Sequence, residues 1–175
     1  MAGVEAEQGH ARVTDSAALS AEIVALLSAR HHSIAVAESL TGGLLVAELI
    51  RTPGASAVVL GGVVAYNTEL KHTVLGVDAE VLAAHGPVHP DVAAQMAAGV
   101  RTALAVSGQA AHIGISTTGV AGPDPQDGQP VGTVYLGFAV GSEVRTRRLE
   151  LSGTREEIRS RVVYESLSEL RQLLG

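Results

Sequence analysis

Cysteine and tryptophan are absent from this sequence of 175 residues, and aromatic residues make up only 2% of it. Without cysteine, the chain forms no disulfide, holds no thiolate-ligated metal and uses no thiolate nucleophile. With so few aromatic rings, the core must be built from Ala, Val, Leu and Ile, and apolar runs of that kind suit a sheet buried on both faces. The length fits one domain with a proper core better than two small ones.

Positive charge and long apolar runs are also scarce. Twelve Lys and Arg face 18 Asp and Glu, which argues against a nucleic-acid surface because phosphate binding depends on clustered cations. No apolar run reaches the roughly 18 residues of a membrane span. Glu5, Glu7 and His10 lie where a secretory signal needs a cationic and then an apolar segment. We therefore expect a cytoplasmic protein that binds neither nucleic acid nor membrane.

Residues 35–45 are the most informative stretch. An apolar run rich in β-formers stops at Glu38 and Ser39, and a helical apolar pattern begins at Leu44. Between them lie a second hydroxyl and two glycines, Thr41, Gly42 and Gly43. Glycines let the backbone approach a ligand, and the free N–H groups at a helix start favour anions, so a serine in this turn can be an exposed nucleophile. The alternative is that these side chains only cap the helix.

Periodicity and turn signals divide the chain into strands and helices. Strands are predicted over residues 33–38, 57–66, 111–117, 131–140 and 143–151, and helices over residues 15–30, 42–51, 67–75, 78–85, 89–106 and 154–174. A right-handed crossover makes the first two strands parallel, while Gly141-Ser142 fits a hairpin turn. Over residues 14–175 we expect a three-layer α/β/α domain with a mostly parallel five-stranded sheet and an antiparallel edge hairpin. Residues 1–13 show no period and are predicted to form a mobile tail.

Three loops are expected on one rim, because parallel strands end at the same edge of a sheet and open α/β sheets bind ligands there. Ser39 follows the first strand and Tyr66 the second, and Asn67 then caps a short helix that carries Lys71 one turn further. The loop 118–128, too rich in Gly, Pro and Asp to be regular, follows the third strand. A hydroxyl and a lysine without any thiol suggest a Ser-Lys hydrolase, in which a neutral lysine takes the proton of the serine.

That chemistry requires Lys71 to lose its charge near neutral pH. Burial and a positive neighbour such as Arg155 would lower the pKa of Lys71, whereas Glu38 or Glu69 nearby would raise it. The alternative for Lys71 is a solvated residue on the surface of a helix.

The sequence predicts neither a metal nor a nicotinamide cofactor. His85 and His89 are four residues apart, but Gly86 and Pro90 break any helix between them, so the two rings do not share a face as helical zinc ligands would. The glycines of the loop 118–128 do not form the dinucleotide fingerprint after the first strand.

Several stretches, in order, resemble the CinA C-terminal domain, or nicotinamide-nucleotide amidase (PncC), family. They are residues 37–43, 66–71 and 118–123, with 130–135 behind them, and the similarity runs from about residue 34 to residue 174. The resemblance implies hydrolysis of the carboxamide of nicotinamide mononucleotide to nicotinate mononucleotide and ammonia, without a metal or an organic cofactor.

Carried over by motif, the catalytic set would be drawn from Ser39, Ser56, Tyr66, Lys71, Thr118 and Arg155. Ser56 lies before the second strand, up to ten residues of roughly 3.3 Å from Tyr66, unless that strand is shorter or a neighbouring subunit contributes. We therefore favour Ser39 as the nucleophile, with Lys71 as its base, and keep Ser56 as the second choice. The Tyr66 phenol would position Lys71 or pass a proton to the leaving ammonia.

The substrate-binding residues expected from the resemblance are Thr41, Gly42, Gly43, Thr118, Gly119 and Arg155. The N–H groups of the first three would hold the oxyanion, and the helix start at Gly153, Thr154 and Arg155 would hold the 5′-phosphate. Thr118 and the glycine loop would line the ribose or the ring. The opposite assignment, with residues 41–43 on the phosphate, stays open.

Two other functions remain compatible with the sequence. One is an amidase that acts on another small amide, and the other is a catalytically idle nucleotide-binding or protein-interaction module linked to competence or DNA damage. An Ala- and Val-rich domain with few aromatics is also expected to share apolar surface with a copy of itself, most simply as a symmetric dimer.

Overall fold

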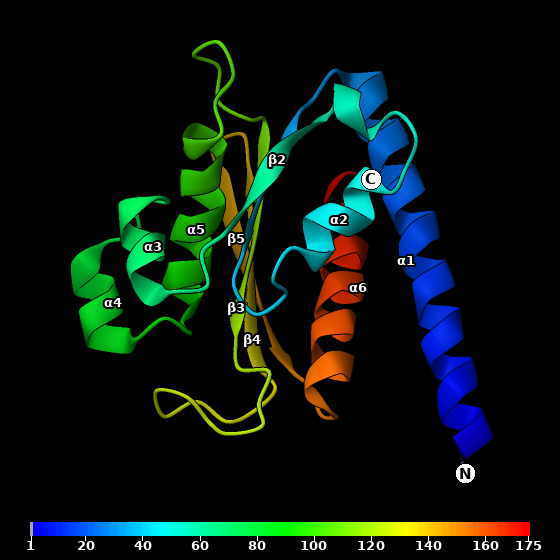
Figure 1. Ribbon diagram of the computed structural model, residues 1–175. Coiled ribbons are helices and arrows are strands. Elements are labelled where there is room, and N and C mark those ends of the chain that lie inside the picture. The colour runs from blue at the N-terminus through cyan, green and yellow to red at the C-terminus, as the bar shows by residue number, and fades with distance from the viewer. Residues whose placement is uncertain (1) are drawn as a thin grey trace.

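A five-stranded mixed sheet forms the centre of the domain, as the computed structural model of residues 2–175 shows (Figure 1). The strands are β1 (Ile34–Glu38), β2 (Val59–Val64), β3 (Ile113–Gly119), β4 (Thr133–Val140) and β5 (Glu143–Glu150), in the spatial order β2-β1-β3-β4-β5. β1 pairs in parallel with β2 and β3, whereas β3–β4 and β4–β5 are antiparallel. The predicted α/β fold with an antiparallel edge hairpin is confirmed.

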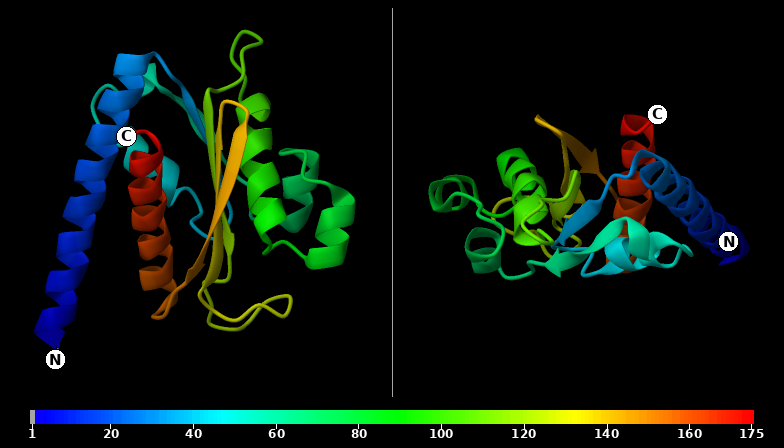
Figure 2. Two further views of the ribbon diagram at one scale, coloured as in Figure 1. Left: turned by 180° about the vertical axis from the view of Figure 1, so that it is seen from behind. Right: turned by 90° about the horizontal axis from the view of Figure 1, so that it is seen from above.

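Helices cover both faces of the sheet and make the other two layers (Figure 2). On one face lie α1 (Ala2–Arg30), α2 (Leu44–Ile50) and α6 (Arg155–Leu173), and on the other lie α3 (Thr68–Thr73), α4 (Ala79–His85) and α5 (Pro90–Ala103). A short 3-10 turn, η1 (Ala55–Ala57), precedes β2. Side chains are described from Asp15 onward, and Met1 lies outside the described residues. α1 begins well before the expected residue 15, and the mobility of residues 1–13 stays a prediction.

β1 is buried along its whole length and separates two apolar cores. Ile34 and Val36 face the core under α1, α2 and α6, while Ala35 and Ala37 face the core under α3, α4 and α5. Small side chains on the second face let α5 approach the sheet closely. This is clearest at Gly114 of β3, where an added Cβ would lie 1.9 Å from the Ala97 carbonyl oxygen of α5.

The alternation along β1 decides where its last residues point. Glu38 continues the row of Ile34 and Val36, and Ser39 continues the row of Ala35 and Ala37. The carboxylate therefore turns toward α2, and the hydroxyl turns toward α3 at the carboxyl edge of the parallel strands.

The loop after β3 is more regular than its composition suggested. Gln126 and Gln129 exchange two backbone hydrogen bonds of 3.1 and 2.8 Å, and Asp127 and Gly128 between them have φ angles of 49° and 74°. Two consecutive positive φ angles are typical of a type I′ hairpin turn, and Asp-Gly is a preferred pair for it. We refer to residues 122–130 as the 122–130 hairpin.

Among the described residues, none of the helices is both long and apolar enough to cross a membrane.

Candidate active site

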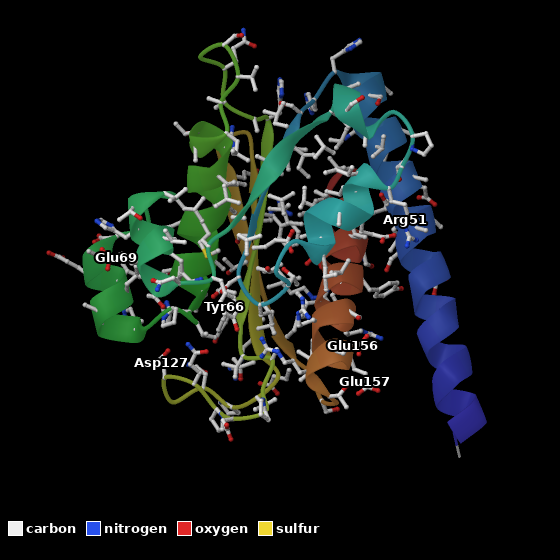
Figure 3. All side chains as sticks on the ribbon, in the orientation of Figure 1. Arg51, Tyr66, Glu69, Asp127, Glu156 and Glu157 are labelled. Carbon is white, nitrogen blue, oxygen red and sulfur yellow. The ribbon has the colours of Figure 1, made fainter. Side chains whose placement is uncertain are left out.

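A cavity of about 250 Å³ opens at the carboxyl edge of the parallel strands. Residues from five separate stretches line it, among them Ser39, Tyr66, Lys71, Thr118, Gly119 and Arg155. Figure 3 shows Tyr66 between α3 and α6, above the 122–130 hairpin that carries Asp127. The structure thus brings together six of the ten site residues predicted from the sequence. Thr41, Gly42, Gly43 and Ser56 do not line the cavity.

Ser39 and Lys71 form a direct pair in this cavity. The Lys71 Nζ donates to Ser39 Oγ at 2.9 Å and to the Ala65 carbonyl oxygen at 2.9 Å. Ser39 is held by its own N–H, which donates to the Thr117 carbonyl oxygen at 3.0 Å and extends the β1–β3 ladder by one residue. Asn67 caps α3 through its side chain, as predicted, and so fixes the turn of helix that carries Lys71.

Lys71 is almost fully buried, with 1% of its surface exposed. Burial lowers the pKa of its side chain from 10.5 to about 8, because a charged ammonium is poorly solvated there. Within the described part of the chain, no carboxylate forms an ion pair with Lys71: Glu69 is exposed, and Glu38 is engaged elsewhere. Once Lys71 is neutral, its amine can keep donating one N–H to Ala65 and can accept the Ser39 hydroxyl proton on its lone pair across the same 2.9 Å.

Glu38 occupies the amino-terminal end of α2. Its fully buried carboxylate accepts backbone N–H groups from Gly43 at 3.0 Å, Leu45 at 3.1 Å and Val46 at 2.8 Å. The N–H of Gly42 donates to the Ser39 carbonyl oxygen at 3.2 Å. The prediction that Gly42 and Gly43 hold the oxyanion is therefore wrong, because both N–H groups already have acceptors inside the protein.

Thr41 also makes its hydrogen bonds within the protein and not with the cavity. Its buried hydroxyl pairs with the Thr117 hydroxyl at 2.8 Å, and its carbonyl oxygen accepts from Arg159 at 3.1 Å. Leu40 follows Ser39 directly and also lines the cavity, and its backbone N–H has no hydrogen-bond acceptor among the described residues.

Tyr66 and Arg155 make a second pair at the mouth of the cavity. The Arg155 guanidinium donates to Tyr66 Oη at 3.0 Å and to the Gly122 carbonyl oxygen at 2.7 Å, which ties α6 to the 122–130 hairpin. The phenol thus contacts Arg155, not Lys71, in contrast to its predicted position. The remaining N–H groups of the guanidinium can still contact an anion in the cavity.

The start of α6 has fewer N–H groups available to bind a phosphate than the sequence predicted. Thr154 and Glu157 form a capping box, in which the Thr154 N–H donates to Glu157 Oε2 at 2.7 Å. Gly153 and Thr154 do not line the cavity, so of the predicted phosphate site only the Arg155 side chain faces it.

Thr118 and Gly119, at the end of β3, also line the cavity. The Thr118 hydroxyl donates to the Pro87 carbonyl oxygen at 2.6 Å, so its remaining capacity toward a ligand is as an acceptor.

Ser56 lies at the other end of β2. Val59 pairs with Ile34 at the start of β1, whereas Val64 pairs with Glu38 at its end. Because Ser56 precedes Val59, it is exposed at the edge opposite the cavity and does not reach Ser39 within one chain.

The sequence did not identify some residues of the site. Asp124 and Gln126 line the cavity from the 122–130 hairpin, and the Asp127-Gly128 pair was the signal that could have revealed this hairpin. The alternative in which Glu38 caps the following helix was among the sequence expectations, and the contacts of its carboxylate with the start of α2 agree with it.

Across the described residues, no three His, Asp or Glu side chains are placed to hold a metal ion. The His85 and His89 rings stack on one another with centroids 4.2 Å apart.

Replacing Glu38 with alanine is expected to lower the free energy of unfolding by about 3 kcal/mol, because three backbone N–H groups at the start of α2 lose a buried charged acceptor. Urea unfolding followed by circular dichroism measures this. Glu38→Gln should lose less, and the exposed Glu156→Ala should stay within about 0.5 kcal/mol of the parent. A Glu38→Ala variant as stable as Glu156→Ala would show that the carboxylate does not hold this turn.

Comparison with known proteins agrees with the fold. The model of the CinA C-terminal domain family matches residues 16–174. A CinA-like protein of Frankia casuarinae is 46% identical over 157 residues, which are 90% of this chain and 35% of the relative. One of Gemmatimonas aurantiaca is 45% identical over 157 residues, 88% of this chain and 35% of the relative. The chain thus spans about a third of the length of these curated relatives.

Solved structures show the same similarity. A CinA superfamily protein of Klebsiella pneumoniae superposes with a TM-score of 0.85 at 32% identity, covering 91% of this chain and 97% of the other. A competence/damage inducible protein of Agrobacterium tumefaciens gives a TM-score of 0.85 at 32% identity, with 92% and 96% covered. The family model covers nearly the whole chain, and the solved structures have the same architecture, so this protein belongs to the CinA C-terminal domain family.

Proposed function

We propose that this domain hydrolyses the carboxamide of nicotinamide mononucleotide to nicotinate mononucleotide and ammonia by a serine/lysine mechanism. The observation that carries the proposal is the 2.9 Å contact between Lys71 Nζ and Ser39 Oγ, together with the burial that brings the pKa of Lys71 to about 8. A serine next to an amine that is partly neutral near physiological pH is an activated nucleophile. The motif resemblance supplies the substrate.

In the first half of the reaction, Ser39 Oγ attacks the amide carbon while Lys71 takes the hydroxyl proton. The tetrahedral oxyanion accepts a hydrogen bond from the Leu40 N–H, because the residue after a nucleophile is well placed for this. Lys71 then gives its proton to the leaving nitrogen, the C–N bond breaks, and ammonia departs from an acyl ester on Ser39.

In the second half, the neutral Lys71 takes a proton from a water molecule that attacks the ester. Collapse of the second tetrahedral intermediate breaks the bond to Ser39 Oγ, which recovers its proton from Lys71. The products are one carboxylic acid and one ammonia for each amide and water consumed. None of the steps needs a metal ion, since Lys71 performs every proton transfer.

The rest of the cavity suits a small polar anion. Arg155 is the cation that remains in its lining when Lys71 is neutral, and we assign it to the 5′-phosphate, with Tyr66 orienting its guanidinium. Thr118 Oγ1, the Asp124 carboxylate and the Gln126 amide are polar groups of the lining that suit the ribose hydroxyls.

The test is ammonia release by the purified protein from nicotinamide mononucleotide, with and without a chelator. Nicotinamide, nicotinamide riboside and unrelated small amides serve as matched substrates. Turnover of the mononucleotide that the chelator does not change is the expected result. Faster turnover of another amide would favour the alternative amidase, and a folded protein that releases no ammonia from any amide would favour the binding module.

A further inference from the structure

The turn between β1 and α2 is held by a side chain that lies far away in the sequence. Arg159 of α6 donates from Nε to the Leu40 carbonyl oxygen at 2.9 Å and from Nη2 to the Thr41 carbonyl oxygen at 3.1 Å. The guanidinium also lies against Gly42, where an added Cβ would be 3.3 Å from Nη2. Arg159 is half-buried and does not line the cavity. One arginine thus contacts three consecutive residues of the turn that follows Ser39.

The partners of Arg159 differ from those of other arginines on the same helix. Arg161 forms an ion pair with Glu165 at 2.6 Å. Arg171 forms one with Glu22 at 2.7 Å. Among the described residues, the hydrogen-bond acceptors of Arg159 are backbone carbonyl oxygens of the turn. Because the planar fork of a guanidinium fixes two acceptors in one geometry, this contact holds the backbone of the turn and not another charge.

Leu40 lies between two peptide groups, and a different contact fixes each of them. The first group contains the Leu40 N–H and is held through the Ser39 carbonyl oxygen, which accepts from the Gly42 N–H at 3.2 Å. The second group contains the Leu40 carbonyl and is held by Arg159. Because peptide groups are planar, fixing both planes leaves the Leu40 backbone between them little freedom. The direction of the Leu40 N–H therefore depends on Arg159.

α6 is a firmly packed support for this contact. A capping box fixes its first turn. Ile158, directly before Arg159, and Val162, three residues after it, are fully buried in the core that also contains the Leu40 side chain. α6 runs beside α2, which begins at the end of the turn (Figure 1). The guanidinium is thus attached to a helix that cannot shift without disturbing the core.

We propose that Arg159 is a positioning residue for the hydrolysis, which orients the Leu40 N–H toward the oxyanion of the tetrahedral intermediates. This role rests on the proposed function, because it takes Ser39 as the nucleophile. The oxyanion exists only after Ser39 Oγ has attacked, so the contribution of the Leu40 N–H is greater in the transition state than in the bound substrate. Loss of Arg159 should therefore lower kcat and leave KM almost unchanged.

Arg155 provides a comparison on the same face of α6. It precedes Arg159 by four residues, so both side chains leave the helix on one side. Arg155 lines the cavity and is assigned to the 5′-phosphate, whereas Arg159 contacts the turn. The phosphate is present in the substrate and in the transition state alike, so loss of Arg155 should raise KM more than it lowers kcat.

The first experiment compares kcat and KM for ammonia release from nicotinamide mononucleotide. Arg159→Met should lower kcat by roughly tenfold to a hundredfold, less than the 10²–10³ that removal of a whole oxyanion donor costs, with KM within about twofold of the parent. Arg155→Met should show the opposite pattern. Arg159→Lys should lose a smaller part of kcat, because an ammonium still donates to one of the two carbonyl oxygens. It also decides the question alone if Arg159→Met does not fold.

Arg171→Met is the matched control for these variants. It removes an arginine from the same helix together with an ion pair whose side chains are 36% and 57% exposed, and it should keep the kcat and KM of the parent. An Arg159→Met variant with the parent kcat, or one in which only KM rises, would overturn the positioning role. An Arg171→Met variant with the same loss of kcat as Arg159→Met would also overturn it, because the effect would then come from the stability of α6.

The second experiment does not depend on the substrate. In the reaction with a fluorophosphonate ester, Ser39 Oγ bonds to phosphorus, Lys71 takes the hydroxyl proton and fluoride leaves, while the phosphoryl oxygen occupies the oxyanion position. Mass spectrometry of the intact protein measures the rate of labelling. Arg159→Met should be labelled roughly tenfold more slowly than the parent and Arg171→Met, and Ser39→Ala should not be labelled.

The labelling rates separate the role of Arg159 from the identity of the substrate. Labelling of Arg159→Met at the parent rate would overturn the positioning role. A parent that is labelled at Ser39 but releases no ammonia would refute the proposed function, and the rates of the variants would still decide the role of Arg159. A parent that is neither labelled nor active would overturn both, because Ser39 would then not be an activated nucleophile.

Discussion

Replacing Ser39 with alanine is expected to lower kcat/KM for ammonia release on the order of 10⁴–10⁶-fold, the range found when an active-site nucleophile is removed. The acyl ester cannot form without Oγ, and the Leu40 N–H and the binding groups alone leave only a small residual rate. Steady-state ammonia assays measure the loss. The buried hydroxyl makes one hydrogen bond with Lys71, which keeps its contact with the Ala65 carbonyl oxygen, so the variant should fold like the parent.

Ser142→Ala is the matched control, because Ser142 is exposed in the turn between β4 and β5. This turn lies at the opposite end of the strands from the cavity, since Val140 pairs with Ile113 at the start of β3. It should keep the parent activity. A Ser39→Ala variant that retains more than about a hundredth of the parent rate would remove Ser39 as the nucleophile.

Replacing Lys71 with methionine is expected to lower kcat/KM by on the order of 10⁴-fold, because the serine loses its proton acceptor. Methionine fills a similar volume without a charge, so the buried position should remain packed. Lys71→Arg should not restore activity, since a guanidinium stays protonated and cannot accept the Ser39 proton. Activity of Lys71→Arg at a tenth of the parent or above would contradict the role of Lys71 as a base.

The same lysine sets the pH dependence of the parent. With a pKa of about 8, Lys71 is neutral in about a tenth of the molecules at pH 7 and in about nine-tenths at pH 9. kcat/KM should therefore rise with unit slope below pH 8 and level off above it. A profile that is flat from pH 6 to pH 9 would show that deprotonation of Lys71 is not required.

The free energy of unfolding should also depend on the titration of Lys71, and it should rise with pH. The pKa of Lys71 is 10.5 when unfolded and about 8 when folded, so between these values the unfolded chain binds more protons and the free energy of unfolding rises with pH. The shift of 10.5 − 8, or 2.5 pH units, corresponds to about 3 kcal/mol gained between pH 8 and pH 10.5. Lys71→Met should lack this increase, which urea unfolding at pH 7.5 and pH 10.5 would measure.

The sequence anticipated most of the fold, because the signals for each element are local. The apolar run of β1, the Gly141-Ser142 turn and the Thr154–Glu157 capping box each depend on residues a few positions apart, and the structure has all three. The parallel pairing of β1 with β2 was accessible for the same reason, since a short right-handed crossover leaves few topologies. The chain also determined that Ser39 and Lys71 reach the same edge, because both follow the carboxyl ends of parallel strands.

Only the tertiary structure decided which polar groups of the site remain available to bind a substrate. Glu38 fills the end of α2 that was expected to bind the oxyanion, and Arg155 approaches Tyr66 from 89 residues away. The pKa of Lys71 depends on how completely the packed layers exclude water, and the distance of Ser56 from the cavity depends on the register of β2 against β1. Periodicity and capping are interactions between neighbours in sequence, whereas burial, charge and hydrogen-bond satisfaction depend on segments that meet only when the chain has folded.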